Sequence, residues 1–143
     1  MKIESRKRAE ELLEQCRTIT LVSVGADGYP SAGVMTRLYT QSIDAFYFLA
    51  GRQSRKVQAF LQNPKSCVSY EAPGGSVSLS GQVEVLEHSS ELVQRCWRPE
   101  LERIFPGGPN PEQLAVLKFV PKAATFCFSG RVEHWEMDEG AQA

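Results

Sequence analysis

Three basic residues stand close together in the stretch AGRQSRKV, namely Arg52, Arg55 and Lys56. Ser54 is suited to cap the N-terminus of a helix, and the apolar residues after it recur at helical spacing. The cations therefore fall in the first turn, where the helix dipole favours anions. Backbone N–H groups, a hydroxyl and cationic side chains at a helix start are the groups that bind phosphate. The stretch predicts a phosphate site, and the alternative is a solvated basic turn without a ligand.

A short aromatic run precedes this helix. Residues 45–50 read as a buried strand, because aromatic side chains favour pleated, buried surfaces. Gly51 ends the strand, and Asn63 with Pro64 ends the helix. The predicted unit is a strand, a glycine turn and a helix.

Other chemistry finds less support in the sequence. The two histidines, His88 and His134, have no carboxylate or cysteine at ligand spacing, so we expect no metal or haem ligation by them. No GxSxG motif surrounds Ser23 or any cysteine, so a nucleophilic hydrolase is not indicated. The four cysteines form no CxxC pair, which favours reduced, mostly buried thiols: Cys16, Cys67, Cys96 and Cys127.

Length and composition indicate an ordinary globular protein. The chain has 143 residues, 42% hydrophobic and 23% charged, which suits one domain spanning residues 1–143. The net charge of −1 gives no overall field toward nucleic acid or an anionic membrane. We expect no membrane span, because no apolar run approaches about 20 residues. The basic N-terminus lacks a following apolar segment, so a cytoplasmic location is expected.

The first half of the chain predicts a helix followed by strands. Apolar residues on one face predict a helix over residues 5–16, within an N-terminal segment 1–17. Alternating patterns predict strands at 18–25 and 29–39, joined by the turn Asp27-Gly28. A second turn, around residues 41–44, leads into the 45–50 strand.

The second half predicts strands at 66–70 and 76–86, with Gly81 as a bend or bulge. A helix is expected to start at His88 or Ser89 and to be interrupted by Pro99, with Trp97 as a core or dimer contact. A loop covers residues 105–111. Two further strands, 114–120 and 123–128, are expected to join at Pro121-Lys122, and residues 137–143 form a polar tail.

Six or seven strands in hairpin order with three short helices predict a mainly β fold. The expected architecture is a small antiparallel split β-barrel. We find no internal repeat in the sequence.

Four motifs resemble one known family. They are Asp27-Gly28-Tyr29-Pro30 with SAGVM after it, Ser54-Arg55-Lys56-Val57 with Asn63-Pro64, Val77-Ser78-Leu79-Ser80-Gly81, and the loop FPGGP at 105–109. In order and spacing they resemble the FMN-binding split-barrel superfamily typified by pyridoxamine 5′-phosphate oxidase, and especially its short bacterial members of the general-stress-protein type. The resemblance spans nearly the whole chain.

The resemblance implies a homodimer with FMN at the subunit interface. It implies that Ser54, Arg55 and Lys56 hold the phosphate, and that Leu49 and Ala50 approach the ribityl chain or phosphate through backbone groups. The remaining implied contacts to the flavin are Met35 and Thr36, through backbone hydrogen bonds, and Ser76, where the oxidases have a glutamine.

One position departs from the family. Relatives often carry an arginine phosphate ligand in the second strand where this chain has Gly33. Arg37 is four residues on, about 13 Å away at the rise of a strand, so it cannot replace that arginine. Arg52 is the better candidate for compensation. A weakened or lost FMN site is the alternative that this glycine leaves open.

The function expected from the resemblance is a flavin-dependent oxidoreductase, a reductase of a small molecule. A non-catalytic flavin-binding or stress-response module is the alternative. The lack of a recognisable triad does not count against catalysis, because the flavin itself carries the chemistry of a flavin enzyme. Oxidation of vitamin B6 is not expected, since residues 130–136 do not match the arginine-containing segment with which the oxidases bind their substrate.

Overall fold

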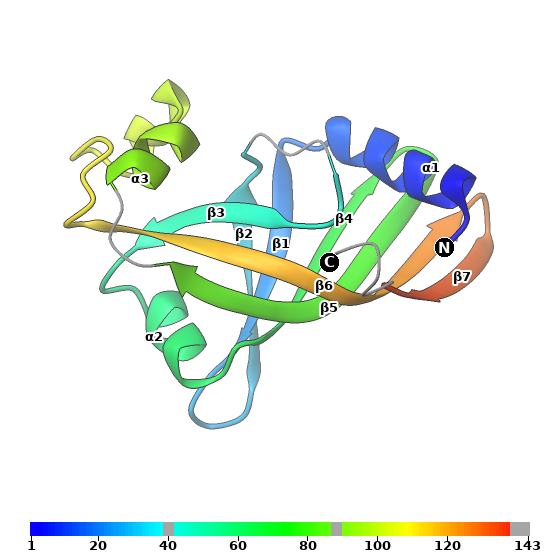
Figure 1. The fold of residues 1–143 in the computed structure, drawn as a ribbon, viewed down its shortest axis with the longest axis horizontal. Coiled ribbons are helices and arrows are strands. Elements are labelled where there is room, and N and C mark those ends of the chain that lie inside the picture. The colour runs from blue at the N-terminus through cyan, green and yellow to red at the C-terminus, as the bar shows by residue number, and fades with distance from the viewer. Residues whose placement is uncertain (39–41, 87–89, 138–143) are drawn as a thin grey trace.

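The fold is known from a computed structural model that describes residues 1–38, 42–86 and 90–137. Its elements in chain order are α1 (Ile3–Glu14), β1 (Thr18–Val24), β2 (Pro30–Thr36), β3 (Phe46–Gly51), α2 (Arg55–Gln62), β4 (Lys65–Ala72), β5 (Gly75–Leu86), α3 (Ser90–Cys96), the 3-10 helix η1 (Pro99–Arg103), β6 (Leu114–Phe128) and β7 (Arg131–Glu136). Among these residues, seven strands form one antiparallel sheet (Figure 1). The predicted mainly β fold is confirmed.

The sheet is split between its two edge strands. Hydrogen-bonded neighbours follow the order β2-β1-β4-β5-β6-β3, and β7 pairs with the other half of β6. Within the described strands no ladder joins β2 to β3, so each of them keeps one edge without a strand partner. This is the open side of the split barrel.

The core consists of inward-facing residues of the strands. Its largest fully buried side chains include Phe46, Phe48, Phe119 and Phe126, and the rings of Phe46 and Phe119 meet edge to face at 6.0 Å. A second buried cluster lies beneath α3 and η1: Leu38, Leu49, Val93, Leu101, Leu114 and Val116. Trp97 packs against this second cluster, in agreement with its predicted core contact.

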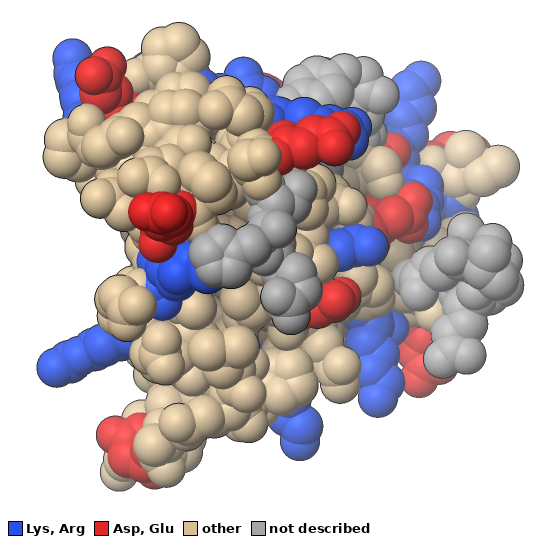
Figure 2. Space-filling model, turned by 60° about the vertical axis from the view of Figure 1, so that its left-hand side comes forward, with Lys and Arg blue, Asp and Glu red and all other residues tan. Residues whose placement is uncertain are grey.

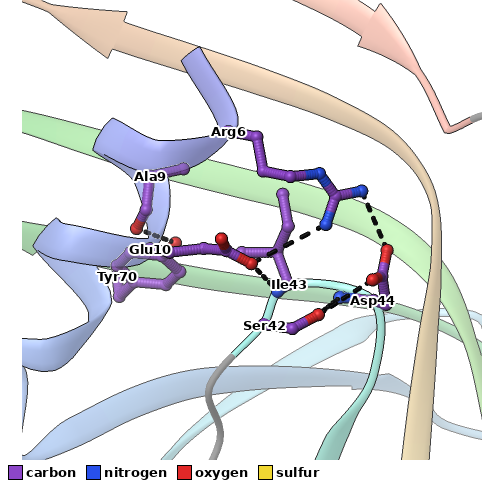
Figure 3. A network of polar contacts seen from close by, with 7 residues as sticks. All are labelled: Arg6, Ala9, Glu10, Ser42, Ile43, Asp44 and Tyr70. Atoms are coloured by element: carbon purple, nitrogen blue, oxygen red, sulfur yellow. Dashed lines mark hydrogen bonds and ion pairs between the residues drawn. The ribbon is translucent and has the colours of Figure 1, made fainter. Parts of the chain in front are cut away.

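Helix α1 is fastened to the turn that leads into β3 (Figure 3). Arg6 donates a hydrogen bond of 2.9 Å to Asp44, and the Glu10 carboxylate accepts one of 3.0 Å from the Ile43 N–H. The bond from Arg6 lowers the pKa of the Asp44 carboxyl. On the strand side, the buried Tyr70 hydroxyl donates to the Ala9 carbonyl at 2.7 Å. These bonds fix where β3 begins.

The prediction of two strands joined at Pro121-Lys122 was wrong, because Leu114–Phe128 is one continuous strand. The register of β5 on β6 shifts between Ser80 and Gly81, and Pro121 lies opposite Gly81. A proline is tolerated where the ladder is irregular. A Cβ at Gly81 would lie 2.1 Å from the Val120 carbonyl oxygen, so only glycine fits there, which confirms the predicted bulge.

Three further features differ from the expectation. Residues 131–136 were not predicted as a strand, yet they form β7 along the second half of β6. Met137 is buried and donates its N–H to the Lys122 carbonyl, so it does not belong to the predicted tail. Strand β2 ends at Thr36, before the expected residue 39. The rest of the tail, His88 and Ser89 lie outside the described residues.

All four cysteines are free thiols, and Cys16 is buried. None of the helices described is long and apolar enough to span a membrane.

Candidate functional site

Helix α2 begins as the sequence predicts. The Ser54 hydroxyl accepts a hydrogen bond of 3.3 Å from the Val57 N–H, and the Ser54 N–H donates to the Gly51 carbonyl at 3.0 Å. No acidic residue lies in the first turn. The N–H groups of Arg55 and Lys56 precede the first intrahelical bond, so the helix itself offers them no acceptor. The helix start therefore presents backbone donors and positive charge without an acidic side chain.

A cavity of about 250 Å³ lies at the split between β2 and β3. It is lined by both edge strands, by the start of α2 and by the segment around η1: Val34, Met35, Thr36, Leu38, Leu49, Ala50, Gly51, Ser54, Lys56, Leu101, Ile104 and Phe105. The polar part of this lining is the Lys56 ammonium with the hydroxyls of Ser54 and Thr36, and Leu101, Ile104 and Phe105 add an apolar wall. An elongated ligand with one anionic and one apolar end suits this lining.

Lys56 is the cation of this cavity. Its side chain is half-buried, and its ammonium lies 3.1 Å from the Met35 sulfur, which is a weak acceptor. Burial lowers the pKa of the Lys56 ammonium. Among the described residues, no carboxylate lies within ion-pair distance of it. An anion entering the cavity would therefore meet a positive charge that no acidic side chain of the described chain offsets.

Six of the nine predicted cofactor residues line this one cavity: Met35, Thr36, Leu49, Ala50, Ser54 and Lys56. Arg55 is exposed at the helix start and does not line it. Arg52 lines a separate cavity with residues of α2 and β5, and its guanidinium donates to the carbonyls of Pro111 at 2.7 Å and Leu114 at 3.4 Å. The structure does not bring Arg52 to the Lys56 ammonium.

Arg37 also lies elsewhere. Its Nε donates a 2.6 Å hydrogen bond to the Cys16 carbonyl, beyond the end of α1. This agrees with the expectation that it does not replace the missing arginine at position 33.

Ser76 lies in a polar groove of about 720 Å³ on the outer face of β1, β4 and β5. The strand registers place four serine and threonine residues side by side across this face, with an uncharged valine at one end and a histidine at the other, because directly paired residues point to the same side of a sheet. Successive partners form a row that we call the hydroxyl row: Val34, Thr20, Ser69, Ser78, Thr125 and His134. Among the residues that the structure describes, Glu71 is the one charged residue that lines the groove, and most of the other lining residues carry hydroxyl groups.

Charges of both signs are interspersed on the side of the molecule that carries α2 and α3, and Figure 2 shows no continuous basic field there. Within the described residues no group of three His, Cys, Asp or Glu side chains lies close enough to hold a metal ion.

Comparison with known proteins supplies the family. Residues 5–128 match the pyridoxamine 5′-phosphate oxidase family, over most of the chain. The chain belongs to the pyridoxamine 5′-phosphate oxidase family. The match contains every residue of the β2–β3 cavity and ends at Phe128, before β7. The resemblance found in the motifs is thereby confirmed. A search against curated proteins finds no match.

Solved structures of other bacterial proteins show the same fold. A Clostridium acetobutylicum protein related to general stress protein 26 has a TM-score of 0.85 at 20% identity, covering 97% of this chain and 99% of its own. General stress protein 26 from Bacillus anthracis has a TM-score of 0.75 at 19% identity, covering 92% and 98%. A haem-binding protein from Mycobacterium smegmatis has a TM-score of 0.75 at 14% identity, covering 95% of this chain and 59% of that one.

The apolar wall of the cavity was not foreseen. Leu101, Ile104 and Phe105 come from a segment expected only as an interrupted helix and a shaped loop. The available signal was the apolar pair Ile104-Phe105 directly before the proline- and glycine-rich loop. In the structure Ile104 lines the cavity while remaining 59% exposed.

Proposed function

We propose that the protein binds FMN in the β2–β3 cavity and acts as a flavin-dependent oxidoreductase on a small molecule. The observation that carries the proposal is the convergence of six predicted residues from two edge strands and a helix start on one cavity. Family membership supports it, because the chain matches the pyridoxamine 5′-phosphate oxidase family, and the resemblance to that family implies FMN as the cofactor.

The polar end of the cavity fits a phosphate. The Lys56 ammonium, the Ser54 hydroxyl and the N–H groups at the start of α2 form the donor set, and Arg55 adds exposed positive charge beside it. Ser54 Oγ accepts from Val57, so its own O–H remains available to donate.

The middle of the cavity fits a heterocycle and its polyol chain. Met35 and Thr36 on one side and Leu49 and Ala50 on the other belong to edge strands, whose backbone groups lack a strand partner on the cavity side. The apolar wall of Leu101 and Phe105 would exclude water. When bound, FMN supplies the hydride or electron chemistry, and the protein supplies orientation and a dry environment.

The cavity of one subunit is small for this cofactor, since pockets for such ligands span about 300–1,000 Å³. We propose that a second copy of the chain completes it, with the hydroxyl row as part of the dimer interface. Val34 is 72% exposed and both lines the cavity and begins the hydroxyl row. In such a dimer Ser76, which lies outside the cavity of its own subunit, is available to the cofactor of the partner.

A charge placed in the hydroxyl row tests the dimer. Ser69→Lys would bury a long cationic side chain where the interface holds a small hydroxyl, and the neighbouring Glu71 carboxylate would offset only part of the desolvation cost, so we expect a monomer by light scattering. Gln94→Lys, on the exposed surface of α3, is the control and should leave the mass of a dimer unchanged. A wild-type monomer, or a dimer with Ser69→Lys, would contradict the interface.

The visible spectrum of protein purified from flavin-replete cells tests the cofactor. We expect flavin absorbance and FMN in the acid extract. A Soret band would instead indicate haem, which the fold of the Mycobacterium smegmatis relative raises as the second candidate. The donor set favours flavin, because no His, Cys or Tyr lines the described cavity and Met35 alone offers a soft ligand for iron. Colourless protein that takes up no FMN would show that Gly33 marks a lost site.

Turnover separates the enzyme from a flavin-binding or stress-response module. Reduction of bound FMN by NADH or NADPH and reoxidation by a panel of small acceptors is expected for an oxidoreductase. Failure with every donor would favour the non-catalytic module. Pyridoxamine 5′-phosphate belongs in the panel as a substrate expected to fail, since residues 130–136 lack the matching arginine segment.

A further inference from the structure

The side chain of Lys56 fills the space next to Gly33. A Cβ built at position 33 would lie 2.7 Å from the Lys56 Nζ and 3.3 Å from its Cε. Contacts of 2.7 Å are closer than real Cβ atoms show. A side chain at position 33 of β2 and the end of the Lys56 side chain from α2 would therefore need the same space. In this chain position 33 is glycine, and the lysine occupies that space.

The backbone does not explain the glycine. Gly33 is absent from the glycines with positive φ, namely Gly28, Gly74, Gly108 and Gly130. It sits inside β2, paired with Leu21, where glycine weakens a strand. The close approach of Lys56 is the contact that any larger residue at position 33 would disturb.

The ammonium reaches a defined place because of this gap. Gly33 and Met35 are two residues apart in a strand and face the same side, so the Cε and Nζ atoms of Lys56 lie over Gly33 while Nζ also contacts the Met35 sulfur. Met35 and Lys56 both line the β2–β3 cavity. Burial of the lysine, which lowers its pKa, agrees with a side chain held in this place.

We propose that Gly33 is a positioning residue for the anion site: its missing side chain leaves the space in which Lys56 places its ammonium in the cavity. This inference rests on the proposed phosphate site. Under this proposal Gly33 does not mark a lost FMN site. Instead, Gly33 and Lys56 act together as a pair in binding the phosphate.

A double-mutant cycle tests the proposal with FMN as the probe, by quenching of flavin fluorescence. Gly33→Ala should weaken FMN binding about tenfold, because the ammonium at the end of a flexible side chain is pushed aside. Its stability should be kept or raised. In the Lys56→Ala background the same change should cost nothing. Equal losses in both backgrounds would overturn the proposal, and Ser31→Ala on the same side of β2 is the control.

A second readout needs no cofactor. The chain has three methionines, so 13C-methyl labelling gives three methyl resonances. Gly33→Ala should shift the Met35 methyl resonance, assigned with Met35→Leu, and leave that of buried Met137 in place. If wild type fails to bind FMN but the Met35 resonance shifts, the proposed function fails and the glycine and lysine pair stands. An unmoved Met35 resonance refutes the pair.

Discussion

Replacing Lys56 with methionine should weaken FMN binding and at the same time stabilise the protein without ligand. Methionine keeps the length and apolar stem of the side chain and removes a half-buried ammonium for which the described chain offers a thioether as the partner. A hydrogen bond to a charged group contributes about 1.5–3 kcal/mol, so the dissociation constant should rise about tenfold to a hundredfold.

The effect can be read as a thermal shift. At an FMN concentration of about 100 times the wild-type dissociation constant, binding stabilises the wild type by about 2.7 kcal/mol. If Lys56→Met binds a hundredfold more weakly, the same FMN stabilises it by about 0.4 kcal/mol. At roughly 3 °C per kcal/mol for a chain of this size, the ligand-induced shift falls from about 8 °C to about 1 °C.

The pH dependence of the ligand-free protein provides the second half of the assay. Because burial lowers the pKa of Lys56 in the folded state, the unfolded chain binds more protons between the folded and the ordinary lysine pKa. The stability of the wild type should therefore rise with pH across that window, and Lys56→Met should lack this rise. Lys7→Met on the exposed side of α1 is the matched control. A Lys56→Met variant that binds FMN like the wild type would refute the phosphate site.

Three further substitutions test parts of the fold and the site. Ser54→Asp should keep the helix cap, since aspartate caps as well as serine, but should weaken FMN binding more than tenfold by repelling the phosphate, as a flavin titration would show. Tyr70→Phe removes the 2.7 Å bond to Ala9 and should lower the free energy of unfolding in urea by about 0.5–1.5 kcal/mol. Asp44→Asn should cost up to about 1 kcal/mol at neutral pH, because this ion pair is partly exposed, and the cost should shrink as the pH falls through the lowered pKa of the wild-type carboxyl; a cost that stays constant as the pH falls would contradict this.

Local signals predicted the local parts of the site. Ser54 is the cap of α2, Gly81 marks the bulge in β5, and Lys56 lies in the first turn of α2, all as residue type and spacing indicated. Each of these depends on a few neighbouring residues, which is the range over which capping and turn preferences act.

Contacts between distant segments could not be predicted in the same way. Pro121 reads as a break, and it is accommodated only because the partner strand is bulged at Gly81. Strand β7 carries few buried residues, so its pairing with β6 gives a weak pattern. The placement of Lys56 over Gly33 depends on how α2 packs against β1, β3 and β5, and the family resemblance indicated only that an arginine is absent at position 33.

The split between β2 and β3 also has a consequence for local opening. These two strands are the opposite ends of the hydrogen-bonded path through the sheet, and a molecule that bonds to both would act as a bridging rung. Binding should then slow amide exchange at Met35, Thr36, Leu49 and Ala50 more than in the central ladder of β5 and β6, where protection is already high. A bound cofactor would thus connect β2 to β3 through its own hydrogen bonds and close the strand path of the sheet into a ring.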